Sequence, residues 1–276
     1  MDANTAAEEL QGKQRQCKIV RAVNMAVYAA AVALFFVPNL RPGGLALMAA
    51  GVLLHVFGAR RLTEAYKEQA AAANLRYGLC AGLADFAFAP KGGLDYPGFR
   101  AWALAPIRDD ARSLLCRNAF TARDGALPLT GQEATFHYPA GNGVRFLSGS
   151  LLTAGGPGGP GWLLLRPGVL EGDALAAFLE GAGFRPVPSP PEGWMLYRQE
   201  GAPELPDGVL RRAGKLEKTV SILRLNGAGA AAFLASRFYT GSKYPSIRPT
   251  AELLRQNILP EWEGLRALFR LWPGRG

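Results

Sequence analysis

The chain has 276 residues, a net charge of +9 and a mean hydropathy close to zero, at +0.04. Its basic residues are scattered along the sequence and form no block, which argues against a nucleic-acid-binding arm. The three cysteines and two histidines show no metal-ligand spacing, so we expect neither a metal site nor a cofactor. The abundance of Gly, Ala, Pro and Arg is typical of a GC-rich bacterial genome.

Two nearly continuous apolar runs lie between residues 19 and 59, separated by the turn-forming segment 38–44. The first run has about 19 residues and would reach roughly 28 Å as a helix, close to the hydrocarbon thickness of a bilayer. The second is shorter and needs flanking side chains that reach the interface. The sequence predicts a transmembrane helical hairpin over 19–59, in which small residues let the helices pack closely. The length of the runs disfavours the two alternatives, a cleaved signal peptide and a buried hairpin of a soluble protein.

Basic residues flank the hairpin on both sides, whereas the connecting loop holds only Arg41. The basic residues nearest to the apolar runs are Lys18, Arg21, Arg60 and Arg61. Positive charge favours the cytoplasmic side of a membrane. We therefore expect a bacterial inner-membrane protein with both termini in the cytoplasm.

The hairpin divides the rest of the chain into three parts. Residues 1–18 are polar and aperiodic, and we expect them to form a mobile basic leader. Residues 60–90 carry a helical pattern that runs to about Ala87, so they are expected to form a juxtamembrane helical stalk. Residues 91–276 are expected to form a cytoplasmic α+β domain.

Residues 91–276 alternate irregularly between strand-like and helix-like patterns, which favours a mixed, largely antiparallel α+β fold. A short helix is expected at 108–117. Strands are expected at 133–138, 144–152, 162–166, 194–198 and 219–225, and helices at 174–181, 207–218, 250–257 and 261–271. The dipeptide Asn226-Gly227 predicts a hairpin between the strand that ends at 225 and another over 231–238.

Two glycine-rich segments match nucleotide-binding patterns in their letters alone. Residues 156–161 fit GxGxxG, but two prolines remove backbone amides and a strand follows, so we interpret the segment as a hairpin loop. Residues 227–232 fit GxGxxA, but no second strand with an acidic residue follows, so a β-hairpin is favoured. His55 is interpreted as an interfacial histidine, and His137 as a surface or core histidine.

The best candidate site is a basic stripe on the helix expected at 207–218, made of Arg211, Arg212, Lys215 and Lys218. Such a stripe is usually a solvated face. Its functional interpretation is contact with anionic lipid headgroups or with an acidic protein. We therefore expect a membrane-anchored binding or scaffolding module whose partner is the lipid bilayer and not nucleic acid. The alternative is an enzyme that acts on a membrane-proximal substrate and carries no recognisable motif.

Several segments carry a resemblance to a known family. They are residues 64–67 (Glu-Ala-Tyr-Lys) after the hairpin, residues 146–152 (Phe-Leu-Ser-Gly-Ser-Leu-Leu), residues 193–197 (Gly-Trp-Met-Leu-Tyr) and the helix-strand-Asn-Gly-strand unit over 205–238. In this order they resemble a bacterial family of uncharacterised membrane proteins, the domain-of-unknown-function family three-one-three-seven. The resemblance implies a membrane-anchored cytoplasmic domain and carries over no catalytic residue.

Overall fold

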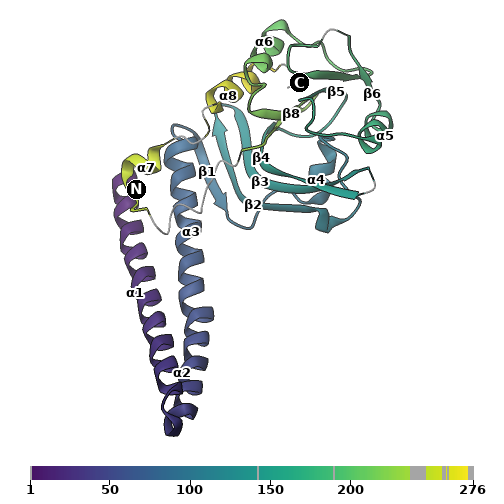
Figure 1. Ribbon diagram of the computed structural model, residues 1–276. Coiled ribbons are helices and arrows are strands. Elements are labelled where there is room, and N and C mark those ends of the chain that lie inside the picture. Colours follow the sequence, from purple (N-terminus) through teal and green to yellow (C-terminus); the bar gives the residue numbers. More distant parts are fainter. Residues whose placement is uncertain are drawn as a thin grey trace. The chain divides into compact units, whose positions relative to one another are not determined.

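The computed structural model describes residues 2–141, 143–188, 190–236, 247–256, 259 and 261–272. The chain folds into two compact units. The first contains the chain up to Ala81 and a later segment that ends at Gln256, and the second contains the remainder. Two long apolar helices precede a sheet with short helices, so the predicted α+β class is confirmed (Figure 1).

The first unit is built on a helical hairpin. Its first arm is α1 (Ala3–Phe35), in which the Asp2 carboxylate accepts hydrogen bonds from the backbone N–H groups of Asn4 and Thr5, both at 2.9 Å. The 3-10 turn η1 (Pro38–Leu40) reverses the chain. The second arm runs without a break through two α-helical and two π-helical segments, α2 (Arg41–Leu53), η2 (Leu54–Ala59), α3 (Arg60–Asn74) and η3 (Leu75–Leu79).

The leader that the sequence predicts to be aperiodic and mobile forms the first part of the helix α1. Its inner side is held by a segment far along the chain, which contains α7 (Ala251–Arg255). Gln11 Nε2 donates to the Pro249 carbonyl at 2.6 Å, and Gln14 Nε2 donates to the Ile247 carbonyl at 2.8 Å. Sequence periodicity misses this helix because its buried face is made largely of alanine and glutamine.

The two arms of the hairpin pack through small residues. On α1 five of the eight buried residues recur every seven positions, at Ala3, Leu10, Cys17, Asn24 and Ala31. On α2 the buried residues are glycines that are also seven apart, at 44 and 51. A Cβ added at position 44 would lie 3.0 Å from the Ala31 carbonyl oxygen, and one at 51 would lie 3.0 Å from the Tyr28 ring. The predicted close packing of the two apolar helices is therefore confirmed.

The predicted helical stalk ends earlier than expected. The second arm stops at Leu79, and residues 84–89 form a strand instead of helix. The arm's end is shaped by α7, because Asn74 Nδ2 donates to the Leu253 and Leu254 carbonyls, both at 3.4 Å. Alanines at 84, 87 and 89 suit a helix by propensity, but pairing with a neighbouring strand outweighs this preference.

Within the described residues, the second unit forms a nine-stranded antiparallel sheet in the order β1-β2-β3-β4-β9-β8-β5-β7-β6. The strands are β1 (Ala84–Ala89), β2 (Leu114–Asp124), β3 (Leu127–Ala140), β4 (Gly143–Gly155), β5 (Gly161–Leu165), β6 (Phe184–Pro186), β7 (Met195–Gln199), β8 (Val220–Asn226) and β9 (Gly229–Leu234). Its helices are α4 (Tyr96–Ala101), η4 (Ala111–Ser113), α5 (Asp173–Gly181), α6 (Asp207–Lys215) and α8 (Trp262–Leu271).

Most predicted strands and helices are confirmed, with shifted ends. The helix expected at 108–117 is wrong, because only the short η4 forms there before β2 begins at Leu114. The helix expected at 207–218 ends at Lys215. The strand expected at 231–238 is present as β9, although residues 237 and 238 lie outside the described residues. The helix expected at 250–257 is α7, and residue 257 likewise lies outside them.

The two glycine-rich segments meet each other at one end of the sheet. The Asn226 side chain accepts from the backbone N–H groups of Ala228 at 2.9 Å and Gly229 at 2.7 Å, which forms the predicted β8–β9 hairpin. The 156–161 segment is a loop between strands as expected, but it is not a hairpin. It joins β4 to β5, which are separated in the sheet by β9 and β8. Glycine is required at 155 because the backbone has φ of +76° and a Cβ would lie 2.5 Å from the Ala228 carbonyl oxygen.

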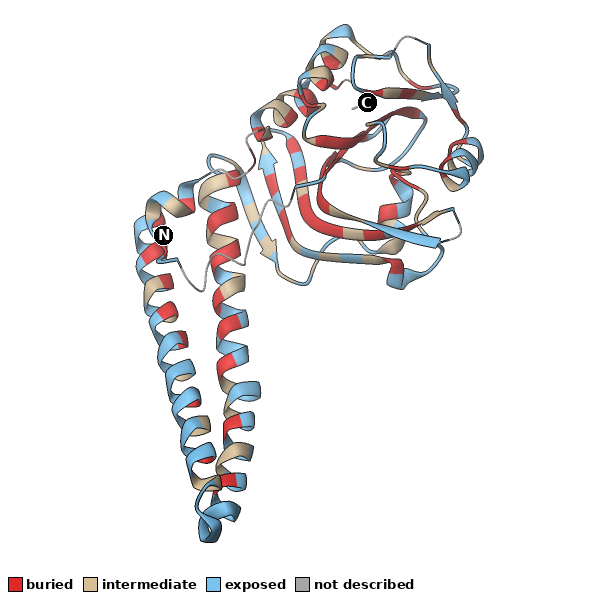
Figure 2. Cartoon of the chain, in the orientation of Figure 1, coloured by how far each residue is buried: buried red, intermediate tan, exposed pale blue. Residues whose placement is uncertain are grey.

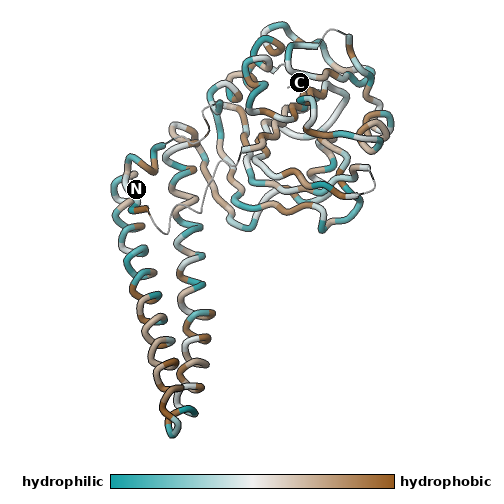
Figure 3. The backbone as a smooth tube through the Cα atoms, viewed as in Figure 1, coloured by the Kyte–Doolittle hydropathy of each residue, from teal (hydrophilic) through white to brown (hydrophobic). Residues whose placement is uncertain are grey.

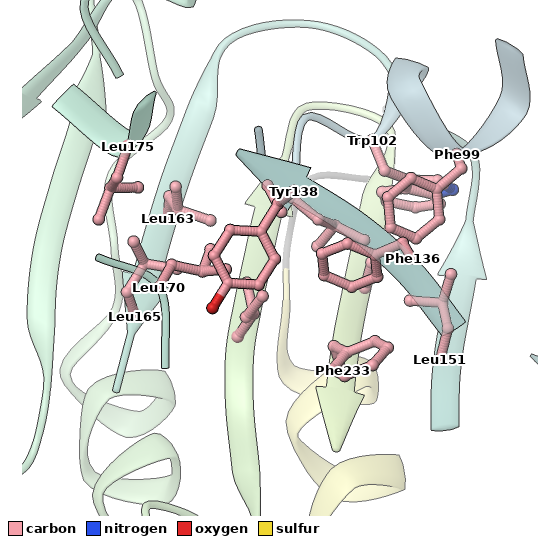
Figure 4. Packing of buried hydrophobic residues seen from close by; sticks show 14 of the residues in the cluster. Phe99, Trp102, Phe136, Tyr138, Leu151, Leu163, Leu165, Leu170, Leu175 and Phe233 are labelled. Carbon is pink, nitrogen blue, oxygen red and sulfur yellow. The ribbon is translucent and has the colours of Figure 1, made fainter. Parts of the chain in front are cut away.

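The main hydrophobic core of the second unit lies between the sheet and the segments around α4 and α5 (Figure 4). At its centre the Phe136 ring lies 5.1 Å from Phe99 and 5.3 Å from Phe233, measured between ring centroids. A second packing layer is formed by α8, which contacts β9 and α6. Its buried face is the predicted one: Trp262, Leu265, Leu268 and Phe269.

Candidate functional site

The apolar part of the hairpin exposes most of its side chains. Both α1 and the arm Pro38–Leu79 are long and apolar enough to cross a membrane, and only 11% and 17% of their most apolar stretches are buried. The core helix of a soluble protein would be mostly buried. Figure 2 shows the outward sides of both arms as exposed, and Figure 3 shows the hydrophobic residues concentrated toward the turn. The exposed apolar side chains include Ile19, Val23, Met25, Val32, Phe36, Leu45, Val52, Leu53, Val56 and Phe57.

The predicted membrane-flanking residues of the two arms lie at the same position along the length of the hairpin. Arg21 donates to Thr63 Oγ1 at 3.3 Å, which aligns the basic residues of α1 with those at the start of α3. Arg60 pairs with Glu64 at 3.0 Å, and the Arg61 guanidinium lies 5.5 Å from the centre of the Phe57 ring. Lys18, the fourth of these residues, is exposed. About 20 residues separate it from the turn at Pro38, a helical length of roughly 30 Å, which equals the hydrocarbon thickness of a bilayer.

Three residues of the predicted basic stripe, Arg211, Arg212 and Lys215, lie on α6. Arg211, Lys215 and Lys218 are exposed and Arg212 is half-buried. Among the described residues none of these four side chains has an ion-pair partner. The charges are therefore available to an outside anion. Lys218 lies beyond the end of the helix but remains next to it, in the turn that leads into β8.

The buried side of α6 packs on the rest of the second unit. Val209 and Ala213 are its buried residues, and α6 packs against α8. The Trp194 indole N–H donates to the Ala213 carbonyl at 3.2 Å. Arg166, at the end of β5, donates to the Lys218 carbonyl at 3.0 Å and adds a fifth basic residue to this surface. Sequence reasoning missed Arg166 because it lies about 50 residues away from the stripe and no local pattern connects the two.

A cavity of about 540 Å³ lies on another part of the second unit. It is lined by the loop before β5, the end of α5, β6 and the end of β7: Gly159, Pro160, Glu180, Ala182, Gly183, Phe184, Arg185, Gln199 and Glu200. None of these is a serine, threonine, cysteine, lysine or histidine. The walls carry two carboxylates, one guanidinium and one amide, polar groups of the kind that orient a bound ligand.

Arg224, on the interior strand β8, contacts two residues of the cavity wall, Phe184 and Gln199. It is only 3% exposed. Its Nη2 donates to Gln199 Oε1 at 2.6 Å, its Nη1 donates to the Trp162 carbonyl at 3.2 Å, and its guanidinium lies 4.8 Å from the centre of the Phe184 ring. Its Nε has no hydrogen-bond partner among the described residues. Burial lowers the pKa of the Arg224 guanidinium to about 10, so it still carries its charge at neutral pH.

The remaining candidates are isolated. His55 is exposed on η2, and His137 is exposed on β3, where its ring lies 6.5 Å from Phe146. The described part of the chain holds no cluster of three or more His, Cys, Asp or Glu residues that could bind a metal. No family model matches the chain, and neither a curated protein nor a solved structure does. The resemblance to family three-one-three-seven therefore stays a prediction.

Proposed function

We propose that this protein is a membrane-anchored binding module. In this proposal the hairpin crosses a bacterial inner membrane with both termini in the cytoplasm. The observation that carries it is the outward-facing apolar surface of the hairpin, because those side chains need an apolar solvent while the inner faces already pack on each other. The basic residues that flank the apolar runs support the orientation, because the turn at the other end of the hairpin carries a single charged residue, Arg41.

The α6 surface is the proposed binding face, and anionic lipid headgroups are its proposed ligand. Four exposed or half-exposed basic side chains without described ion-pair partners attract an anionic leaflet, with about 1 kcal/mol per basic residue near the surface. Because the protein is tethered to the membrane in this proposal, the α6 surface meets lipid headgroups at a high effective concentration. The lining of the cavity presents no serine, threonine, cysteine, lysine or histidine, so we favour binding over the enzymatic alternative.

Insertion and orientation are tested by single-cysteine labelling. Asn39→Cys in the turn and Lys218→Cys beside α6 are made in a chain whose three native cysteines are changed to serine. In intact cells a membrane-impermeant maleimide should label position 39, while position 218 should react only after lysis. Labelling of 218 in intact cells would reverse the proposed orientation. Release of the full-length protein from membranes by alkaline carbonate would refute insertion.

The α6 surface is tested by hydrogen exchange of the full-length protein in nanodiscs. Exchange over residues 207–218 should be slower with phosphatidylglycerol than with phosphatidylcholine alone, and the difference should vanish in R211Q/R212Q/K215Q/K218Q and at high salt. The matched control removes four other exposed arginines of the same unit, as R100Q/R112Q/R123Q/R145Q, and should keep the protection. Equal exchange in both lipids would refute lipid binding, and protection by an added acidic protein alone would assign the face to a protein partner.

A further inference from the structure

We propose that the cavity beside β7 binds a small zwitterion, a molecule that carries a carboxylate and a protonated amine, of which free amino acids are the main class. The proposal concerns a different surface from α6 and does not depend on membrane insertion. It rests on an uncompensated positive charge behind the cavity and on negative groups at its rim.

The positive end is Arg224. A buried guanidinium without a counter-ion is unfavourable by several kcal/mol, and natural proteins normally pair such a group with a carboxylate. Here no described carboxylate forms an ion pair with Arg224, and its closest side-chain partner is the neutral amide of Gln199, at 2.6 Å. The amide provides a hydrogen bond but leaves the charge in place. In this low-dielectric position the field of that charge is weakly screened and attracts an anion that enters the cavity.

Gln199 connects Arg224 to the cavity, because its side chain also lines the wall. Its orientation is fixed by two further hydrogen bonds. Oε1 accepts from the Gly161 backbone N–H at 3.0 Å, and Nε2 donates to the Ala182 carbonyl at 2.7 Å. Oε1 therefore faces Arg224 and Nε2 faces the end of α5. Arg185 adds an exposed positive charge to the same wall. A ligand carboxylate at this wall would meet two cations.

The negative groups of the lining are two carboxylates. Glu180 and Glu200 are both exposed, and Glu180 belongs to the last turn of α5, a nine-residue helix. The carbonyls at a helix C-terminus carry a partial negative charge that favours cations. Two carboxylates and this helix end would suit a protonated amine. They would repel a simple anion at the rim, just as Arg224 repels a simple cation further in. A ligand with both charges avoids both penalties.

Binding is tested on the full-length protein in detergent micelles by calorimetry. The standard L-amino acids are the probes, followed by the decarboxylated amine and the deaminated acid of the best binder. We expect saturable binding of at least one amino acid, with both single-charge analogues weaker by about tenfold or more. Phosphoethanolamine is included because it represents a zwitterionic lipid headgroup.

Variants connect the binding to the named groups. Gln199→Glu should weaken binding by about tenfold or more, because its carboxylate neutralises Arg224. Glu200 is exposed, so Glu200→Gln keeps the fold, and it should weaken binding by removing part of the negative rim. Glu192→Gln, an exposed glutamate outside the cavity, is the control and should bind as the wild type does.

Three results would overturn the proposal: no amino acid binds, a single-charge analogue binds as tightly as the amino acid, or both Gln199→Glu and Glu200→Gln bind normally. Tighter binding of phosphoethanolamine than of any amino acid would also overturn it, in favour of a lipid headgroup.

Discussion

An ion-pair cluster around Asp124 joins α8 to the sheet, and its contribution to stability can be predicted. Asp124 ends β2, and its carboxylate accepts hydrogen bonds from two arginines of α8. Arg266 Nη2 lies 3.0 Å from Oδ1, and Arg270 Nε lies 2.8 Å from Oδ2. The Asp124 side chain is only 7% exposed. Because α8 supports α6, loss of this contact would loosen the proposed binding face.

The strength of the cluster follows from the pKa of Asp124. Hydrogen bonds from Arg266 and Arg270 lower the pKa of the Asp124 carboxyl from 3.8 to about 2. Each pKa unit corresponds to about 1.4 kcal/mol, so the ionised carboxylate contributes about 2 kcal/mol to folding. Because the folded-state pKa is the lower one, this contribution is complete above about pH 5 and is lost as the pH falls toward 2. At pH 3 about half of it should remain.

The test is urea unfolding of the full-length protein in micelles, followed by tryptophan fluorescence. All five tryptophans lie in the second unit, at 102, 162, 194, 262 and 272, so the signal reports this unit alone. Asp124→Asn should reduce the free energy of unfolding by about 2 kcal/mol at pH 7 and by about half as much at pH 3. Asp109→Asn removes the partner of Arg100 from an exposed pair and should change it by less than about 0.5 kcal/mol. Equal losses at both pH values, or equal losses in both variants, would refute the reasoning.

Two further predictions concern single positions of the sheet. Gly149→Ala places a Cβ against the Leu234 carbonyl oxygen and should break the pairing of β4 with β9. In the same unfolding assay it should lower the free energy of unfolding by about 3 kcal/mol or more. The control is Gly143→Ala, whose added Cβ would have its nearest atom 3.9 Å away and should be nearly neutral, and equal behaviour of the two variants would contradict the register. Desolvation of the half-buried Cys116 thiol raises its pKa to about 11. At neutral pH iodoacetamide should therefore label it about 100-fold more slowly than a thiol with the ordinary value of 9.0, as measured by peptide mass spectrometry, and labelling as fast as that of a free thiol would contradict the raised pKa.

The strands predicted correctly are those whose signals are local. β3 and β4 alternate in polarity around a glycine-rich turn, and β8 and β9 are joined through Asn226-Gly227. The sequence predicts helix at the start of β1 because no helix breaker separates it from the preceding arm, and alanine favours a helix until a partner strand is known. At the start of β2 a bulge disturbs the alternation near Asn118, whose φ is +51°, so the strand signal is weak there. Both errors concern the β1–β2 end of the sheet, where pairing partners decide the structure.

The candidate sites also differ in whether their residues lie close together in the sequence. The α6 stripe could be predicted because Arg211, Arg212 and Lys215 lie close together in the sequence. Arg166 and the group around Arg224 could not, since β5, β7 and β8 become neighbours only in the folded sheet. Arg224 looks like an ordinary strand residue in the sequence. Its burial, and the absence of an ion-pair partner among the described residues, become apparent only in the folded sheet.

The hairpin shows which sequence signal identifies the face through which its two arms pack. In a water-soluble protein the inner face of a helix is its apolar face, but here large apolar side chains point outward and a seven-residue repeat made mostly of small or polar residues points inward. In the proposed bilayer, lipid would remove the hydrophobic difference between the faces, and the helices would approach where side chains are small. Asn24 occupies one of these inner positions and its Oδ1 has no partner among the described residues. A polar residue at such a position fixes helix register at some loss of stability. The spacing of Gly44 and Gly51 therefore identifies the packing face of this hairpin better than its hydrophobic pattern does.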